Sequence, residues 1–265
     1  MNRIKNVLVQ HDKSQKSFVG FITAGDPTIE KTKEFILEMI KGGADLIEIG
    51  IPFSDPIAEG PVIQAANIRA LSKGIDTDKV FQLVGEVRKE SEIPLVFMTY
   101  LNLVFSYGYE KFFKRCEEAG VDGIILPDLP FEEKKEVAEV ASKYGVEVIS
   151  LIAPTSENRI KMIAKEANGF VYLVSSMGVT GMRTEIKTDL DSIIKVIREN
   201  TEIPCFVGFG INTSEQAVEI SQKCDGVIVG SAIVKIIEEY GENAGKYIFD
   251  YVKSMKDSIQ SGSNR

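Results

Sequence analysis

The sequence predicts an α/β protein built as a single (β/α)8 barrel over residues 1–265. Eight apolar runs alternate with amphipathic stretches from one end of the chain to the other. The runs are almost continuously hydrophobic, which is typical of parallel strands that helices cover. In a chain of 265 residues, eight such units favour a closed barrel over an open doubly wound sheet.

The expected strands span 17–23, 45–51, 93–99, 121–127, 146–152, 169–174, 203–209 and 225–230. Helices are expected over 28–41, 77–90, 132–143, 189–198 and 214–222. Residues suited to cap a helix stand at or next to the start of many helices, namely Thr28, Thr77, Ser156, Asp189 and Thr213. A helix at 2–11 is expected to plug the base of the barrel, and helices at 231–240 and 244–259 follow the last strand. We expect 261–265 to be a frayed tail.

The composition argues against several classes of function. The formal net charge is −8, and no segment concentrates Lys and Arg, so a nucleic-acid partner is not expected. No apolar run has the length of a membrane span, and residues 1–10 lack the core of a signal peptide. The three cysteines are widely spaced, as expected of reduced thiols in a cytoplasmic protein. With His11 as the single histidine, a histidine-based triad or zinc site is nearly excluded.

Glu48 is the strongest candidate for catalysis. It interrupts the apolar strand 45–51, where alternation places it on the face opposite Ile47, Ile49 and Ile51. The isoleucine face is expected to pack against helices, so Glu48 points into the barrel, near the carboxyl end of the strand. Barrel enzymes form their sites at that end. No Lys or Arg stands at the end of any predicted strand, so burial should raise the pKa of Glu48 towards neutrality. Such a group can donate and accept protons near pH 7. The missing lysine also argues against Schiff-base chemistry.

Glycine-containing turns follow the last three predicted strands, at 178–181, 208–211 and 230–233. Any one of them is explained by a tight turn alone. Together with Ser231 at the start of a short helix, they predict a phosphate site, because exposed amides of Gly210, Gly230 and Ser231 can donate to the anion.

For each of the remaining polar candidates, a purely structural role is an alternative to a functional one. Asp55, Glu59 and Asp128 lie in loops, where carboxylates often cap helices or form turns. As a metal cluster with Glu48 they lack ligand spacing, and no metal is expected. Tyr100 and Tyr172 are placed to line a pocket for an aromatic substrate, although a packed tyrosine is the default.

The sequence resembles the alpha subunit of tryptophan synthase from about residue 18 to the C-terminal helix. The motifs that carry the resemblance are 21–27, 48–56, 60–64, 127–130, 172–175, 178–181, 208–211 and 229–232. The run Ile-Pro-Phe-Ser-Asp-Pro at 51–56 is highly specific, whereas other phosphate-binding barrels share the glycines. The resemblance implies substrate contacts at Phe21, Tyr100, Tyr172 and Thr180. It implies phosphate contacts at Gly181, Phe209, Gly210, Gly230 and Ser231.

The resemblance also implies an activity: cleavage of indole-3-glycerol phosphate to indole and glyceraldehyde 3-phosphate by acid–base retro-aldol chemistry. Glu48 would protonate indole C3, and a second carboxylate would accept the ring N–H. In the family that second group is an aspartate; here it is Glu59, one methylene longer. No cofactor is implied for this chain. A beta subunit that carries pyridoxal phosphate is the implied partner, in an α2β2 complex.

Residues 53–56 and 101–107 are expected to form loops at the barrel mouth that contact this partner, with Asp55 and Asp128 nearby. For the apolar residues Leu103, Val104 and Phe105, packing on the following helix is an equal alternative. The long connection 175–188 is expected to be a lid over substrate. Two other functions stay open: another phosphate-binding barrel isomerase, and a catalytically weakened subunit that only activates its partner.

Overall fold

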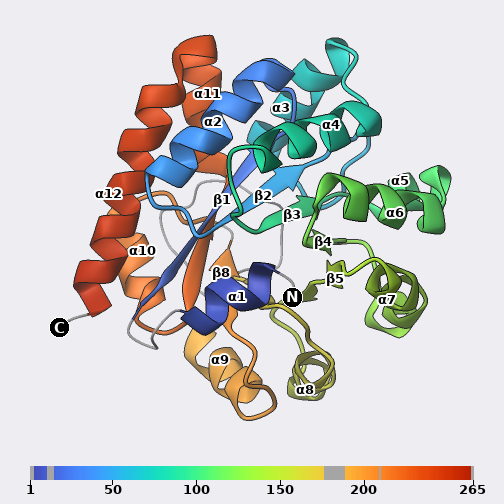
Figure 1. Ribbon diagram of the computed structural model, residues 1–265. Coiled ribbons are helices and arrows are strands. Elements are labelled where there is room, and N and C mark those ends of the chain that lie inside the picture. The colour runs from blue at the N-terminus through green and yellow to red at the C-terminus, as the bar shows by residue number, and fades with distance from the viewer. Residues whose placement is uncertain (1–2, 11–14, 176–188, 209, 264–265) are drawn as a thin grey trace.

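The computed structural model describes residues 3–10, 15–175, 189–208 and 210–263. Its centre is one sheet of parallel strands surrounded by helices (Figure 1). The strands are β1 (Ser17–Thr23), β2 (Leu46–Gly50), β3 (Leu95–Met98), β4 (Gly123–Ile125), β5 (Glu147–Val148), β6 (Ser150–Ile152), β7 (Val171–Val174), β8 (Cys205–Gly208) and β9 (Gly226–Val229). Their order in the sheet is β5-β4-β3-β2-β1-β9-β8-β7-β6, so β1 pairs with both β2 and β9. The structure thus confirms the predicted barrel.

The strand expected at 146–152 is two strands, which corrects the prediction. β5 pairs with β4, and the Ile149 N–H still donates to the Ile124 carbonyl on that side at 2.9 Å. From Ser150 onward the chain pairs with β7 instead. The chain changes partners at Ile149, and this one connected segment closes the ring.

The helices are α1 (Arg3–Gln10), α2 (Ile29–Lys41), α3 (Pro61–Ser72), α4 (Thr77–Arg88), α5 (Leu101–Tyr107), α6 (Tyr109–Ala119), α7 (Lys134–Lys143), α8 (Glu157–Lys165), α9 (Leu190–Arg198), α10 (Ser214–Ser221), α11 (Ser231–Tyr240) and α12 (Gly245–Ser263). Short 3-10 turns η1 (Phe131–Glu133) and η2 (Gly241–Asn243) precede α7 and α12. None of the described helices is long and apolar enough to cross a membrane.

Four of the five predicted capping residues accept the expected backbone N–H: Thr28, Ser156, Asp189 and Thr213. Thr77 does not, because the preceding Asp76 caps α4 through the N–H of Lys79. The segment 101–107, expected as a loop, is helix α5. Its first turn is capped from another loop, since the Asp128 carboxylate accepts the Leu101 N–H at 2.9 and 3.1 Å.

The apolar side chains form two groups, one on each face of the barrel wall. The outer group packs beneath the helices and includes Ile47, Ile49 and Ile51, as the alternation predicts. The inner group fills the barrel and includes Val19, Leu46, Val96, Phe170 and Phe206. Ile4 of α1 belongs to this inner group and is fully buried, so α1 plugs one end of the barrel, across which it lies in Figure 1.

Aspartates at three strand entries share one structural device. Each accepts the N–H of a neighbouring strand and pairs with a cation: Asp45 with Phe18 and Lys256, Asp122 with Leu95 and Arg88, and Asp225 with Cys205 and Arg198. The recurrence of aspartate at these positions therefore fixes strand register at the base of the barrel.

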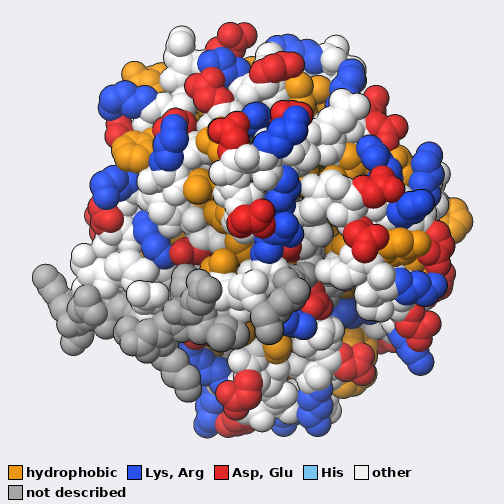
Figure 2. Space-filling view, viewed as in Figure 1, with side chains coloured by type: hydrophobic (Ala, Val, Ile, Leu, Met, Phe, Trp, Pro, Cys, Tyr) orange, Lys and Arg blue, Asp and Glu red, His pale blue; other side chains and the backbone are white. Residues whose placement is uncertain are grey.

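Helix α12 extends into the segment 261–265, as far as Ser263, and the expected fraying of this tail stays a prediction. Gln260 donates to the Lys16 carbonyl at 3.0 Å, and Gly262 lies against Val218 so closely that an added Cβ would stand 2.8 Å away. Residues 264–265 lie outside the described residues. On the face seen in Figure 2, acidic and basic side chains are interspersed and no basic patch gathers.

Candidate active site

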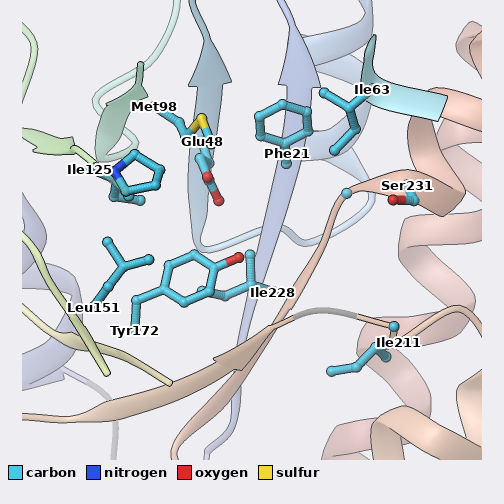
Figure 3. A pocket seen from close by; sticks show the side chains of 13 residues that line it. Phe21, Glu48, Ile63, Met98, Ile125, Leu151, Tyr172, Ile211, Ile228 and Ser231 are labelled. Atoms are coloured by element: carbon cyan, nitrogen blue, oxygen red, sulfur yellow. The ribbon is translucent and has the colours of Figure 1, made fainter. Parts of the chain in front are cut away.

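A pocket opens at the carboxyl ends of the strands. Its walls are mostly apolar, and its polar groups come from a few strand ends (Figure 3). The lining residues are Phe21, Glu48, Ile63, Met98, Ile125, Pro127, Leu151, Tyr172, Gly210, Ile211, Ile228, Gly230 and Ser231. A few convergent polar groups in an apolar pocket are typical of a substrate site.

Glu48 points into this pocket from β2 and is only 3% exposed (Figure 3). Its Oε2 has no hydrogen-bond partner, and no Lys or Arg pairs with it among the described residues. Burial raises the pKa of Glu48 to about 8, and the negative charge of Glu59 adds to the rise. Glu48 is therefore a neutral acid at pH 7, whose proton is available to a bound molecule.

Glu59 lies beside the pocket rather than among its lining residues. Its carboxylate is buried and accepts a hydrogen bond of 2.5 Å from Asn67 Nδ2 on α3. Burial raises the pKa of Glu59 to about 7, although hydrogen bonds from Asn67 and Tyr100 oppose the rise. The preceding Ala58 lines a second cavity that shares the walls Pro127 and Leu151 with the first. The chain neighbour of Glu59, and not Glu59 itself, thus lines this adjoining space.

Tyr100 lies against Glu59, and its predicted contact with substrate stays a prediction. It is 2% exposed and does not line the pocket; its ring stacks on Phe53, with ring centroids 5.2 Å apart. Its hydroxyl accepts the Ala58 N–H at 3.2 Å and hydrogen-bonds to Glu59. The structure thus makes Tyr100 a support for the segment that carries Glu59.

Phe21 and Tyr172 both line the pocket, and each occupies space that a glycine leaves open. A Cβ on Gly50 would lie 2.7 Å from the Phe21 ring. A Cβ on Gly208 would lie 2.5 Å from the Tyr172 hydroxyl. Glycine on the neighbouring strand is therefore required for each ring to adopt its position.

The polar end of the pocket is formed by Gly210, Gly230 and Ser231. Gly210 has a φ of 86°, a conformation that favours glycine, and Gly230 stands directly before the first turn of α11. The free N–H groups and the dipole of a helix start attract anions. Thr180, Gly181 and Phe209 were also predicted to bind substrate or phosphate, but they lie outside the described residues. So does 176–188 of the expected lid.

Of the two loop aspartates, Asp128 caps α5 as described above, and Asp55 is exposed with the Ser54 hydroxyl donating to it. No group of three or more potential metal ligands occurs within the described ranges. Sequence reasoning missed the apolar walls and Asn67. Strand alternation was a usable signal for Met98, Ile125 and Ile228, whereas nothing local marked Asn67.

Comparison with known proteins decides the family. The family model for the tryptophan synthase alpha chain matches residues 8–260. The chain belongs to the tryptophan synthase alpha chain family. It is 49% identical over 263 residues to the alpha chain of Caldanaerobacter subterraneus subsp. tengcongensis, covering 98% of this chain and 100% of that one. The alpha chain of Lacticaseibacillus casei is 47% identical over 249 residues, 94% of each chain.

Solved alpha-chain structures agree. The tryptophan synthase subunit alpha of Legionella pneumophila str. Paris superimposes with a TM-score of 0.90 at 38% identity, covering 98% of this chain and 99% of that one. A chain from the tryptophan synthase α2β2 complex of Pyrococcus furiosus superimposes with a TM-score of 0.85 at 38% identity, covering 91% and 98%. As a member of this family, the chain is a carbon–carbon lyase that cleaves indole-3-glycerol phosphate in tryptophan biosynthesis.

Proposed function

We propose that Glu48 carries out both proton transfers of this cleavage and that Glu59 stabilises the charged indole ring between them. The observation that carries the proposal is the Glu48 carboxyl group. It is buried, its Oε2 lacks a partner in the described part of the chain, and it faces an apolar pocket. A buried polar group without a partner costs about 1–3 kcal/mol, so a bound substrate is the natural partner for it.

The chemistry follows from the protonation states. Glu48, neutral at pH 7, gives its proton to C3 of the indole ring, which leaves positive charge on the ring nitrogen. The ionised form of Glu59 accepts the ring N–H and stabilises that charge. Glu48, now a carboxylate, takes the proton from the side-chain hydroxyl next to C3. The carbon–carbon bond then breaks, its electron pair returns to the ring, and indole and glyceraldehyde 3-phosphate separate with Glu48 protonated again.

The rest of the pocket suits the substrate. We assign the phosphate to the amides of Gly210, Gly230 and Ser231, opposite the apolar side of the pocket. Tyr172 and Phe21 flank the space between this polar end and Glu48 (Figure 3). The apolar walls strengthen each electrostatic interaction inside the pocket, because they exclude water.

We also propose a beta subunit as the partner, in an α2β2 complex like that of the Pyrococcus furiosus structure, with pyridoxal phosphate bound in the beta subunit. Two segments near the barrel mouth expose large apolar side chains: Ile57 is 71% exposed and Phe105, on α5, is 69% exposed. Neighbouring Val104 is fully buried and Leu103 packs on the core. Among residues 103–105, only Phe105 is therefore exposed for contact with a partner. A cytoplasmic location stays a prediction.

The test is indole release from indole-3-glycerol phosphate, measured with the chain alone and with a beta subunit. We expect slow release alone and faster release with the partner. Glu48→Gln should lower kcat by about 10³-fold or more, and Glu59→Gln by about 10²-fold. Exposed Glu202→Gln is the matched control and should leave kcat unchanged. If no indole forms under either condition, or if Glu48→Gln keeps full activity, the proposal is wrong. Acceleration of the partner without indole release would indicate the purely activating subunit.

A further inference from the structure

Helix α3 holds Glu59 through two side chains that donate to different parts of the same residue. Gln64 Nε2 donates to the Glu59 backbone carbonyl at 2.7 Å, and Asn67 Nδ2 donates to the Glu59 carboxylate at 2.5 Å. Asn67 is 3% exposed, on the face of α3 that also buries Ile63 and Ala70. A polar side chain in such a place needs a partner, and the Glu59 carboxylate supplies it.

We propose that Asn67 is a positioning residue that fixes the Glu59 carboxylate for the substrate's ring N–H and favours its ionised form. The inference rests on the role given to Glu59 above and deepens it. Asn67 donates to Oε2, and the Tyr100 hydroxyl also hydrogen-bonds to the carboxylate. A carboxylate has about four lone-pair sites, so these two donors leave acceptor capacity for a ligand.

The first reason why Glu59 needs such a partner is the conformational freedom of its side chain. A glutamate side chain has one more rotatable bond than an aspartate, and a catalytic group that is misplaced by about 1 Å can cost about 10²-fold in rate. The hydrogen bond from Asn67 removes this freedom at the far end of the side chain. Because α3 begins only two residues after Glu59, at Pro61, the donor and the loop belong to one local unit.

The second reason is electrostatic. Two described side chains hydrogen-bond to the Glu59 carboxylate, Tyr100 from the segment after β3 and Asn67 from α3. Glu48 on β2 is the nearby acid, and the charge of Glu59 raises its pKa. Burial favours the neutral form of Glu59, and a nearby charge on Glu48 would favour it further. The donors Asn67 and Tyr100 oppose both effects, because a hydrogen bond to a carboxylate is stronger when the carboxylate is ionised. Asn67 provides this donor without bringing a charge of its own.

The test compares Asn67→Ala with Gln64→Ala. Both variants remove one hydrogen bond from α3 to Glu59, but only the first removes a bond to the carboxylate. We expect Asn67→Ala to lower kcat about 10-fold to 100-fold at pH 7 and to move the acidic limb of the pH profile of kcat/KM upward by about one pH unit. Gln64→Ala should leave the position of that limb unchanged. Asn67→Ser, which keeps a small polar group but cannot reach the carboxylate, should shift the limb like Asn67→Ala.

Three outcomes decide the question. A shifted acidic limb in both Asn67 variants, and not in Gln64→Ala, supports the inference. An unshifted limb in the Asn67 variants, or an equal shift in Gln64→Ala, overturns it. If Glu59→Gln itself keeps full activity, the role of Glu59 is wrong, and the failure then lies in the proposed function rather than in the part given to Asn67. Thermal unfolding of each variant at pH 7 identifies any that are not folded. If Asn67→Ala does not fold, the pH profile of Asn67→Ser alone decides the question.

Discussion

Replacing Glu48 by glutamine should stabilise this protein while abolishing its chemistry. Burial of Glu48 raises its pKa to about 8, whereas an unfolded chain leaves it near the ordinary value of 4.5. A difference of one in pKa corresponds to about 1.36 kcal/mol, so the full difference amounts to about 5 kcal/mol of unfolding free energy. Glutamine has nearly the same shape and no charge, and it does not carry this cost.

The sign of the effect depends on pH. Below about pH 4.5 both the folded and the unfolded chain keep the Glu48 proton, and this residue costs nothing. Between about pH 4.5 and pH 8 the unfolded chain releases the proton and the folded chain retains it, so the free energy of unfolding falls as pH rises. The advantage of Glu48→Gln should therefore grow through this window. It should reach about 3 kcal/mol at pH 7 and level off above pH 8.

The assay is urea denaturation followed by circular dichroism, at intervals from pH 4.5 to pH 9, for the wild type and for Glu48→Gln. Exposed Glu202→Gln serves as the control and should follow the wild type at every pH. A stability difference that does not change with pH would refute the reasoning. So would a variant less stable than the wild type at pH 8, because Glu48 would then have a stabilising partner in the folded protein.

Two further substitutions test other parts of the molecule. Gly208→Ala places a Cβ 2.5 Å from the Tyr172 hydroxyl and should displace that ring. We expect KM to rise about 10-fold in steady-state kinetics and the free energy of unfolding to fall by about 1–3 kcal/mol in thermal unfolding. An unchanged KM would show that Tyr172 does not shape the substrate site. Arg88→Met removes the cation 2.6 Å from buried Asp122. The free energy of unfolding should fall by about 3 kcal/mol at pH 7, with KM unchanged. A loss below about 1 kcal/mol would mean that the other partners of Asp122 are enough to stabilise its buried charge.

Features that depend on neighbouring residues were predictable from the sequence. The strand 17–23 and the helix 231–240 have the predicted bounds, because apolar periodicity marks both. The inward direction of Glu48 followed from the alternation of side chains along its strand. Glycines after strands predicted the polar end of the pocket where Gly210 and Gly230 now stand.

Features that depend on distant contacts were not predictable in this way. The break at Ile149 arises because the chain changes from one neighbouring strand to another, and both neighbours are remote in sequence. Helix α5 is seven residues long and is capped by Asp128, 27 positions after Leu101. A local pattern cannot show such a cap. The same holds for Tyr100, whose hydroxyl reaches back 42 positions to Ala58.

Carboxylates at the two ends of this barrel illustrate how stability and function are separated in one fold. At the base, Asp45, Asp122 and Asp225 each bond a backbone N–H and a cation, so their charges stabilise the strand ring. At the mouth, Glu48 has neither kind of partner for its Oε2, and Glu59 has hydrogen-bond donors but no paired cation among the described residues. A cation at the mouth would hold these acids ionised and remove the proton that Glu48 gives in the proposed mechanism. The reaction therefore requires that the acids at the mouth have no paired cation. The cost of burying them is offset by the stability that the paired acids at the base supply.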